Sequence, residues 1–284
     1  MGEGRPGPQA RDQLIADVDA FARTSVETKW GPVSVRQRGA TGKCLFLLHG
    51  IGGNSGGWRK QHEAFSSRFR VVAWDAPGYG ESFDFAAEAP NLEDYADAFV
   101  ATLEGLGVDR ADVVGHSLGG LIAACAAAKY PERIDRLVLT ACSSGHATYD
   151  EEKRQSILRT RLDAFSTGSP TAYARTRVKN VLSPAPSAEV FEEAVSVMAQ
   201  IRQPGFPQAT RMVSASDIFP YLARIKAPTR VICGTADQVT PPALNRKIAE
   251  SIPGADFVSI EGAGHWLFLE YPEQFNNAVL QFVT

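Results

Sequence analysis

Apolar residues along the chain follow two patterns, which are short continuous runs and longer stretches with helical spacing. Continuous apolar runs are typical of strands that are buried on both faces of a parallel sheet. The runs predict strands over 44–48, 70–74, 111–114, 136–140, 230–233 and 256–260. The stretches with helical spacing predict helices over 58–68, 92–106, 119–130, 243–251 and 272–282. This alternation of strand and helix predicts an α/β protein with a mostly parallel central sheet flanked by helices.

One interval breaks the alternation. Between Ala141 and Thr229 the pattern is helical, with breaks at 183–186 and at Pro204-Gly205. The helices predicted there span 151–165, 171–181 and 188–202. Sheets of this kind bind ligands beyond the carboxyl ends of their strands, so a helical insertion at this place is expected to cover a site. The predicted division is a core of residues 25–142 and 227–284 with an inserted helical cap, or lid, of residues 143–226.

The beginning of the chain differs from the rest. Helical spacing of apolar residues predicts a helix over 12–23, within an N-terminal extension of residues 1–24. Two alternating runs follow, over 25–30 and 33–38, separated by Gly31-Pro32, and they predict an antiparallel hairpin at a sheet edge. A role as a scaffold or interaction module rests on the N-terminal helix alone.

Composition and charge narrow the classes of function. The 284 residues include 44% hydrophobic and 21% charged residues, which is ordinary for a globular protein. A net charge of −3 gives no basic field that would attract nucleic acid or anionic lipid. No apolar run approaches the roughly 18 residues that span a bilayer, and the N-terminus has no signal-peptide core. The predicted partner is therefore a small-molecule substrate and neither nucleic acid nor membrane, and the predicted location is cytoplasmic. A homodimer is compatible with the sequence.

The cysteines give no sign of a metal site or of structural disulfides. Each lies in or beside an apolar strand or helix, and no two have metal-ligand spacing. They are Cys44, Cys125, Cys142 and Cys233. They are interpreted as small buried side chains in a reducing compartment, and the prediction includes no metal and no cofactor.

The strongest chemical signal is the pentapeptide that surrounds Ser117. It follows the apolar run 111–114 and opens a helix rich in small residues. Strand, G-x-S-x-G and helix in this order form a nucleophile elbow, a sharp turn that leaves the serine hydroxyl exposed above the sheet. Ser117 is therefore the predicted nucleophile, the alternative being a glycine-rich turn without chemistry.

The loops after three other strands complete a constellation. After the first buried strand, the loop from His49 is rich in glycine, and the N–H of Ile51 is predicted to face a developing oxyanion together with that of Leu118. The alternatives are an ordinary turn or a phosphate loop, although neither phosphate-loop motif occurs there. Asp237 and His265 follow the last two strands. They are candidates for the orienting acid and the general base, although each alone could be an ordinary turn or surface residue.

The order Ser…Asp…His, each residue after a strand, joins these loops into one site. Together with these motifs the chain resembles capped serine hydrolases of the α/β-hydrolase fold, the subgroup of meta-cleavage-product hydrolases, enol-lactonases and small carboxylesterases. The motifs that carry the resemblance are His49-Gly50, the loop 75–82, the Ser117 elbow, 234–237 and Gly264-His265. The resemblance implies that Ser117 is the nucleophile, His265 the base and acid, and Asp237 the orienting acid. It also implies that Ile51 and Leu118 form the oxyanion hole.

The resemblance leaves the reaction open. Serine at position 117 argues against the carboxylate chemistry of haloalkane dehalogenases and epoxide hydrolases. Meta-cleavage-product hydrolases usually have a Gly-Pro-Gly oxyanion loop, whereas this chain has 50–54 as Gly-Ile-Gly-Gly-Asn, although the His265-Trp266 pair resembles theirs. The predicted function is hydrolysis of a small ester, lactone or amide through an acyl-enzyme. The alternatives are C–C bond hydrolysis, or a non-hydrolytic ligand receptor or lyase on the same fold.

Substrate contacts are predicted from the cap and from the histidine loop. Trp266, beside the histidine, is the first candidate for substrate binding. Several cap arginines are candidates for pairing with a substrate carboxylate, with Arg177 chosen among them. The cap arginines considered are Arg161, Arg175, Arg177, Arg202 and Arg211. Tyr173, Phe206 and Met212 are candidates for an apolar pocket wall, the alternative being ordinary packing.

Overall fold

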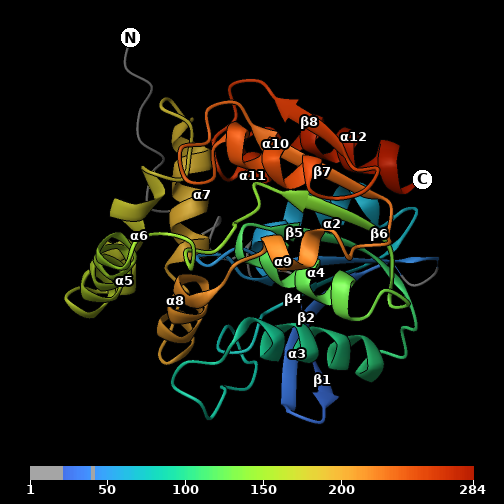
Figure 1. Cartoon of the computed structure of the whole chain (residues 1–284), viewed down its shortest axis with the longest axis horizontal. Helices are drawn as coiled ribbons and strands as arrows, with labels where there is room; N and C mark the ends of the chain where they lie inside the picture. Colours follow the sequence, from blue (N-terminus) through green and yellow to red (C-terminus); the bar gives the residue numbers. More distant parts are fainter. Residues whose placement is uncertain (1–21, 40–41) are drawn as a thin grey trace.

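The computed structural model describes residues 22–39 and 42–284, and its centre is an eight-stranded sheet (Figure 1). The strands are β1 Arg23–Thr28, β2 Gly31–Arg38, β3 Cys44–Leu48, β4 Arg70–Trp74, β5 Ala111–His116, β6 Ile134–Thr140, β7 Thr229–Gly234 and β8 Asp256–Ile260. Their order across the sheet is β1-β2-β4-β3-β5-β6-β7-β8. The pairings that involve β2 are antiparallel. The strands β4, β3, β5, β6, β7 and β8 run parallel to one another. The predicted mostly parallel sheet is confirmed.

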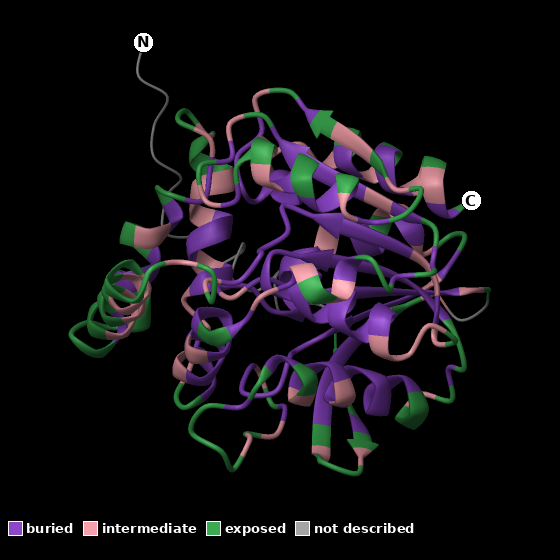
Figure 2. Cartoon of the chain, viewed as in Figure 1, coloured by how far each residue is buried: buried purple, intermediate pink, exposed green. Residues whose placement is uncertain are grey.

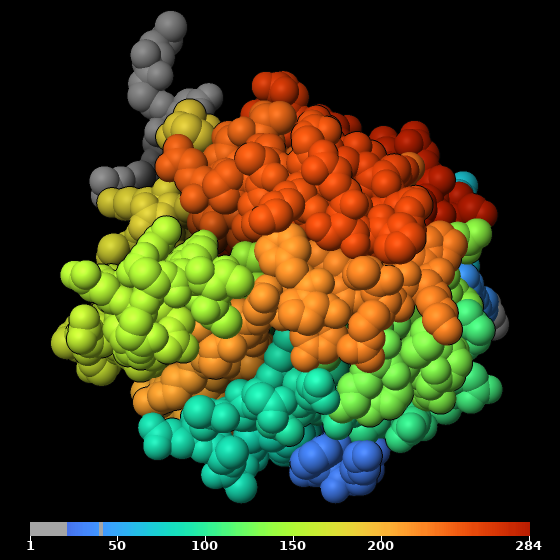
Figure 3. Space-filling model, viewed as in Figure 1, coloured from blue at the N-terminus to red at the C-terminus, as the bar shows by residue number. Residues whose placement is uncertain are grey.

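Helices flank this sheet and account for the remaining regular structure. Those of the core are η1 Ser55–Trp58, α2 Arg59–Phe65, α3 Leu92–Gly105, α4 Leu118–Lys129, α10 Pro242–Glu250, α11 Leu267–Glu270 and α12 Pro272–Val283. Between β6 and β7 lie α5 Glu151–Ser166, α6 Pro170–Val178, α7 Ala188–Met198, α8 Gly205–Ala215 and α9 Phe219–Leu222. Figure 1 shows α5 to α8 grouped together on the left of the sheet. In the space-filling view the yellow-green part of this segment meets the orange atoms that follow it in the sequence in one continuous surface (Figure 3).

Burial explains why the core strands read as continuous apolar runs. Every residue of β3 and β5 is buried, and so are the residues of α4 from Leu118 to Ala128, whose small side chains let the helix lie close to the sheet (Figure 2). By contrast, α5 buries only Phe165 and is mostly exposed. All four cysteines are free and buried, as predicted.

Several predicted elements need correction. The strand at 256–260 was expected to be buried on both faces, but β8 is an edge strand with a single neighbour, and only Ile260 is buried. The hairpin is confirmed, although its turn is Lys29-Trp30 and Gly31 already begins β2 with φ +128°. The helix predicted over 12–23 lies outside the described residues except at its end, where Arg23 belongs to β1.

Helix ends in the insertion also differ from the prediction. Helices α6 and α7 stop at Val178 and Met198, before the predicted ends at 181 and 202. Helix α8 was missed because Pro204-Gly205 was interpreted as a break. Pro204 is the N-cap of α8. A proline there removes no intrahelical hydrogen bond, because the first N–H groups of a helix have no intrahelical partner.

Candidate active site

Ser117 lies at the turn between β5 and α4, in the strand–turn–helix geometry that the pentapeptide predicts. Its backbone angles are φ 53° and ψ −110°, a conformation that is strained for a residue with a side chain. Two glycines allow the turn. A Cβ on Gly115 would lie 2.5 Å from the carbonyl oxygen of Gly119, and a Cβ on Gly119 would lie 2.2 Å from that of Leu48. The tight packing of β5, α4 and β3 thus fixes where the serine hydroxyl stands.

Replacing Gly119 by alanine is expected to lower the free energy of unfolding by about 2–3 kcal/mol, because the added methyl group meets backbone atoms that cannot move aside cheaply. Chemical denaturation measures this loss. Gly168→Ala is the control, since a Cβ there meets only the Ala172 side chain at 3.7 Å. Equal stabilities of the two variants would contradict the account of the elbow.

His265 and Asp237 are joined directly at the carboxyl ends of the last two strands. Nδ1 of His265 lies 2.8 Å from Oδ2 of Asp237. Asp237 also accepts hydrogen bonds through Oδ1 from the N–H groups of Val239 at 2.8 Å and Thr240 at 2.9 Å. Burial alone would raise the pKa of Asp237, but the nearby His265 and these hydrogen bonds outweigh it and lower the pKa. The carboxylate is therefore ionised and able to hold the Nδ1–H tautomer of His265.

Ser117 and His265 line the same cavity. Within residues 22–39 and 42–284, no hydrogen bond joins the Ser117 hydroxyl to the His265 ring. The exposed fractions of the predicted nucleophile, base and acid are 7%, 4% and 3%. The structure thus brings all three predicted residues to one enclosed place, with the histidine–aspartate bond formed.

The predicted oxyanion donors lie on the same cavity wall. Leu118 is the first residue of α4, so its N–H has no partner within the helix. Ile51 lies in the loop after β3, and the Tyr79 hydroxyl donates a 2.7 Å hydrogen bond to its carbonyl oxygen. His49 joins this loop to the loop that begins at Asp75. Its Nε2 accepts a hydrogen bond from the Ala76 N–H at 3.0 Å, and its Nδ1 lies 2.8 Å from the Gly50 carbonyl oxygen. Burial lowers the pKa of His49, which favours this neutral, structural form.

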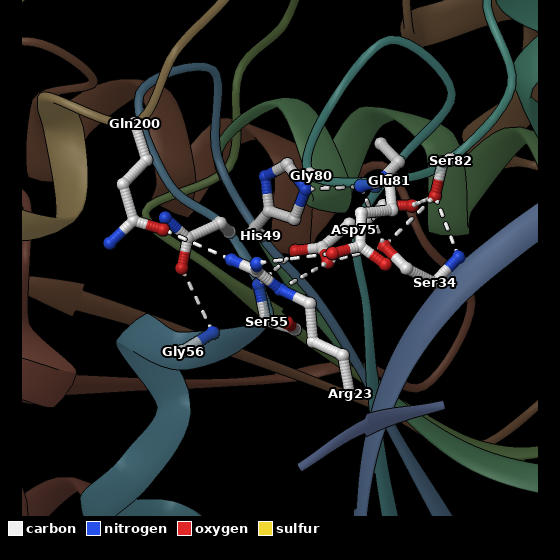
Figure 4. Close-up of polar contacts among 12 residues, drawn as sticks. Arg23, Ser34, His49, Ser55, Gly56, Asp75, Gly80, Glu81, Ser82 and Gln200 are labelled. Carbon is white, nitrogen blue, oxygen red and sulfur yellow. Dashed lines mark hydrogen bonds and ion pairs between the residues drawn. The ribbon is translucent and has the colours of Figure 1, made fainter. Parts of the chain in front are cut away.

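A buried polar cluster around Asp75 holds the far end of the same loop (Figure 4). Oδ1 of Asp75 accepts a 2.7 Å hydrogen bond from the Ser55 N–H, and Oδ2 accepts one of 2.6 Å from the Ser34 hydroxyl. Nε of Arg23 lies 3.5 Å from the same carboxylate, and the guanidinium also donates to Gln200, just beyond α7. The 75–82 loop therefore holds the oxyanion loop through hydrogen bonds between side chains and backbone, a role that the sequence motif alone did not specify.

The insertion supplies the other wall of the cavity. Five residues from it that contact the cavity are His146, Tyr149, Arg161, Tyr173 and Arg177. Of the predicted apolar wall residues, Tyr173 and Phe206 line the cavity, whereas Met212 lies elsewhere. Trp266 lines it as well, and its backbone N–H donates to the Val181 carbonyl at 3.1 Å.

Two of the five cap arginines differ from the rest. Arg175 pairs with Glu192, Arg202 with Asp84 and Arg211 with Glu88. Arg161 and Arg177 line the cavity, and neither guanidinium forms an ion pair or a hydrogen bond with any described residue. Burial, and next the neighbouring Arg177, lower the pKa of Arg161 to about 10. At this pKa Arg161 remains charged at neutral pH. The cavity thus contains two guanidinium groups without a counter-ion from the described chain.

Sequence reasoning missed His146 and Tyr149. Their rings stack with centroids 5.2 Å apart, and burial together with Arg161 and Lys153 lowers the pKa of His146 to about 4. The imidazole is therefore neutral beside the two arginines. Both residues follow β6, the strand next to β5, so a search of all loops at the carboxyl edge of the sheet would have found them.

Two further features are absent from residues 22–39 and 42–284, a cluster of metal ligands and a membrane-spanning helix. No group of three or more histidine, cysteine, aspartate or glutamate side chains there is arranged to hold a metal ion. No helix in that part is both long and apolar enough to cross a lipid bilayer.

Comparison with known proteins places this geometry in a family. The chain is 30% identical over 274 residues to a 2-hydroxy-6-oxononadienedioate/2-hydroxy-6-oxononatrienedioate hydrolase of Burkholderia vietnamiensis, covering 88% of this chain and 90% of that protein. A hydrolase structure from Pseudomonas aeruginosa has a TM-score of 0.83 and 28% identity, over 93% of this chain and 99% of that one. A malate-bound thermophilic esterase from Thermogutta terrifontis has a TM-score of 0.81 and 25% identity, over 92% and 98%. A model of the alpha/beta hydrolase family matches residues 45–278. The chain therefore belongs to the alpha/beta hydrolase family, as a hydrolase on this fold.

Proposed function

We propose that the protein is a cofactor-independent serine hydrolase that cleaves a small ester, lactone or amide bearing a carboxylate. One observation carries the proposal. Ser117 lines the same cavity as two unpaired arginines and as His265, which is hydrogen-bonded to Asp237. Residues 143–226 serve as the cap that closes this cavity. The natural substrate is a small molecule, and no nucleic acid or membrane takes part.

In the proposed reaction, Nε2 of His265 takes the hydroxyl proton of Ser117 as the serine oxygen attacks the substrate carbonyl. The N–H groups of Ile51 and Leu118 stabilise the oxyanion of the tetrahedral intermediate. The intermediate collapses to an acyl-enzyme, and His265 returns the proton to the leaving group. Water, deprotonated by His265, then releases the acid product and regenerates the serine. Asp237 stabilises the imidazolium that forms in each half of the reaction.

The two cavity arginines support a carboxylate on the substrate. An uncompensated guanidinium in an enclosed site is costly, and a carboxylate ligand supplies charge-assisted hydrogen bonds that offset this cost. Two similar proteins agree with this chemistry by name, because one acts on dioates and the other is bound to malate. Arg177 and Arg161 are proposed to bind the carboxylate, while Trp266, Tyr173 and Phe206 contact the apolar part of the substrate.

The alternative with specific support is C–C bond hydrolysis, because a relative 30% identical to this chain is named for a dienedioate substrate. In that reaction the same residues would first ketonise a dienol and then attack the ketone. A dienol-ketone and an ester with the same carboxylate, assayed side by side, distinguish the two reactions. A ligand receptor or a lyase would turn over neither by hydrolysis.

The proposal is tested by intact-mass measurement after exposure to a fluorophosphonate. A single adduct is expected on the wild type, because an activated serine attacks phosphorus as it attacks a carbonyl. Ser117→Ala and His265→Ala are expected to lose the adduct. A folded wild-type protein that remains unlabelled would overturn the assignment of the nucleophile and favour the receptor. Labelling that persists in Ser117→Ala would mean that another residue is the nucleophile.

A further inference from the structure

Glu270, the last residue of α11, connects the histidine loop to the insertion. Its Oε2 accepts a 2.9 Å hydrogen bond from the N–H of Gly264, the residue before His265. Its Oε1 accepts a 2.7 Å hydrogen bond from the N–H of Ser183, which follows α6. One carboxylate therefore holds two backbone segments that are far apart in the sequence.

The two segments are packed as closely as backbones allow. A Cβ on Gly264 would lie 2.4 Å from the Ser183 nitrogen, so a residue with a side chain does not fit there without a shift. The Trp266 N–H donates to the Val181 carbonyl at 3.1 Å on the other side of the histidine. His265 is thus flanked in the chain by two residues whose backbones are bonded, directly or through Glu270, to residues 181–183 of the insertion.

The hydrogen bonds of Glu270 favour its ionised form. Both oxygens accept N–H groups, and only an ionised carboxylate is purely an acceptor. Burial raises the pKa of Glu270, the bonds to Ser183 and Gly264 act against this, and the charge of Asp237 adds to the rise. In the ionised form that the two N–H donors favour, the group is a second negative charge on the side of the histidine loop, in addition to Asp237.

Other charged groups around α11 are arranged differently. Nζ of Lys60 lies 3.3 Å from the Leu269 carbonyl oxygen, but it pairs with Glu193 of α7 at 3.0 Å. Glu273 at the start of α12 is exposed. Toward the site, the titratable groups are Asp237, His265 and His116, whose ring centroid lies 4.8 Å from that of His265 and 5.0 Å from that of Phe268 in α11.

We propose that Glu270 is a positioning residue that ties the His265 loop to residues 181–183 of the cap, so that the general base is in place only when the cap is seated. The proposal rests on the proposed role of His265. It makes the geometry of the base depend on the same segment, from α6 onward, that carries Arg177 into the cavity. Substrate binding by the cap and proton transfer by the histidine are coupled through one carboxylate.

The test compares Glu270→Gln, Glu270→Asp and Glu273→Gln with the wild type in ester hydrolysis and in the rate of fluorophosphonate labelling. Glutamine keeps one acceptor but presents an NH₂ group to the second N–H, and aspartate keeps the charge but is too short to reach both. Both Glu270 variants are expected to lose about 10–100-fold in kcat and in labelling rate, with KM changed less than kcat, because a small displacement of a catalytic group has an effect of this size. Glu273→Gln is the matched control and should behave as wild type.

The pH profile separates positioning from mere support of the fold. Loss of a negative charge near the base disfavours its protonated form, so the acid limb of kcat/KM is expected to move to lower pH by about half a unit or more in Glu270→Gln but not in Glu270→Asp. Thermal unfolding of each variant shows whether it is folded, and if Glu270→Gln does not fold, the kcat and labelling rate of Glu270→Asp decide. A folded Glu270 variant with the wild-type kcat and labelling rate would refute the proposal. The proposed function would still stand, because it depends on the labelling of Ser117.

Discussion

Replacing Asp237 by asparagine is expected to lower kcat about 10⁴-fold while the protein remains folded. Oδ1 of the new amide still accepts the N–H groups of Val239 and Thr240, so the turn is retained. The amide NH₂ takes the place of Oδ2, 2.8 Å from Nδ1 of His265, and donates where the carboxylate accepts. The imidazole must then carry its proton on Nε2, and in this tautomer it cannot take the proton of Ser117.

Steady-state hydrolysis of an activated ester measures this loss, and denaturation shows that the variant is folded. Asp109→Asn is the control, because Asp109 is exposed on the loop between α3 and β5 and lies outside the cavity lining. A fall of less than tenfold in a folded Asp237→Asn protein would mean that the aspartate does not orient the base. Its bonds to Val239 and Thr240 would then be its whole role.

The sequence indicated the fold and the loops of the site because their signals are local. A strand buried on both faces needs an apolar run, and the turn at Ser117 needs small neighbours, so β3, β5 and the elbow were placed within one or two residues. The order of Ser117, Asp237 and His265 after parallel strands was enough to expect them at one edge of the sheet. The bond between His265 and Asp237 is a consequence of that topology.

What was missed depends on contacts between distant segments. Arg177 was chosen from five cap arginines with the same local pattern, but only the positions of their acidic neighbours show that Arg161 is unpaired as well. The link of Glu270 to Ser183 joins residues 87 positions apart, and no spacing rule predicts it. The edge strand β8 was misjudged for a related reason, since an apolar run does not show how many neighbours a strand has.

The unpaired arginines lead to the second prediction, which concerns substrate choice. Replacing both Arg161 and Arg177 by methionine is expected to lower kcat/KM about 10³-fold for a 4-nitrophenyl monoester of succinic acid. Each charge-assisted hydrogen bond to the carboxylate contributes about 1.5–3 kcal/mol. For neutral 4-nitrophenyl butyrate, kcat/KM should be unchanged or higher, because the chemistry at Ser117 does not involve the arginines. Arg175→Met is the matched control, since its guanidinium pairs with Glu192.

Stability distinguishes a binding role from a structural one. Replacing an arginine that stabilises the fold removes an ion pair, whereas Arg161 forms no ion pair with the described residues. Burial already lowers the pKa of its guanidinium to about 10. Its charged form is therefore disfavoured in the folded state, and Arg161→Met should leave the free energy of unfolding unchanged or raise it. A variant that is less stable and in which kcat/KM falls equally for both esters would show that Arg161 stabilises the cap. A variant that is at least as stable but selectively unable to use the anionic ester would show that the cation is kept for the substrate.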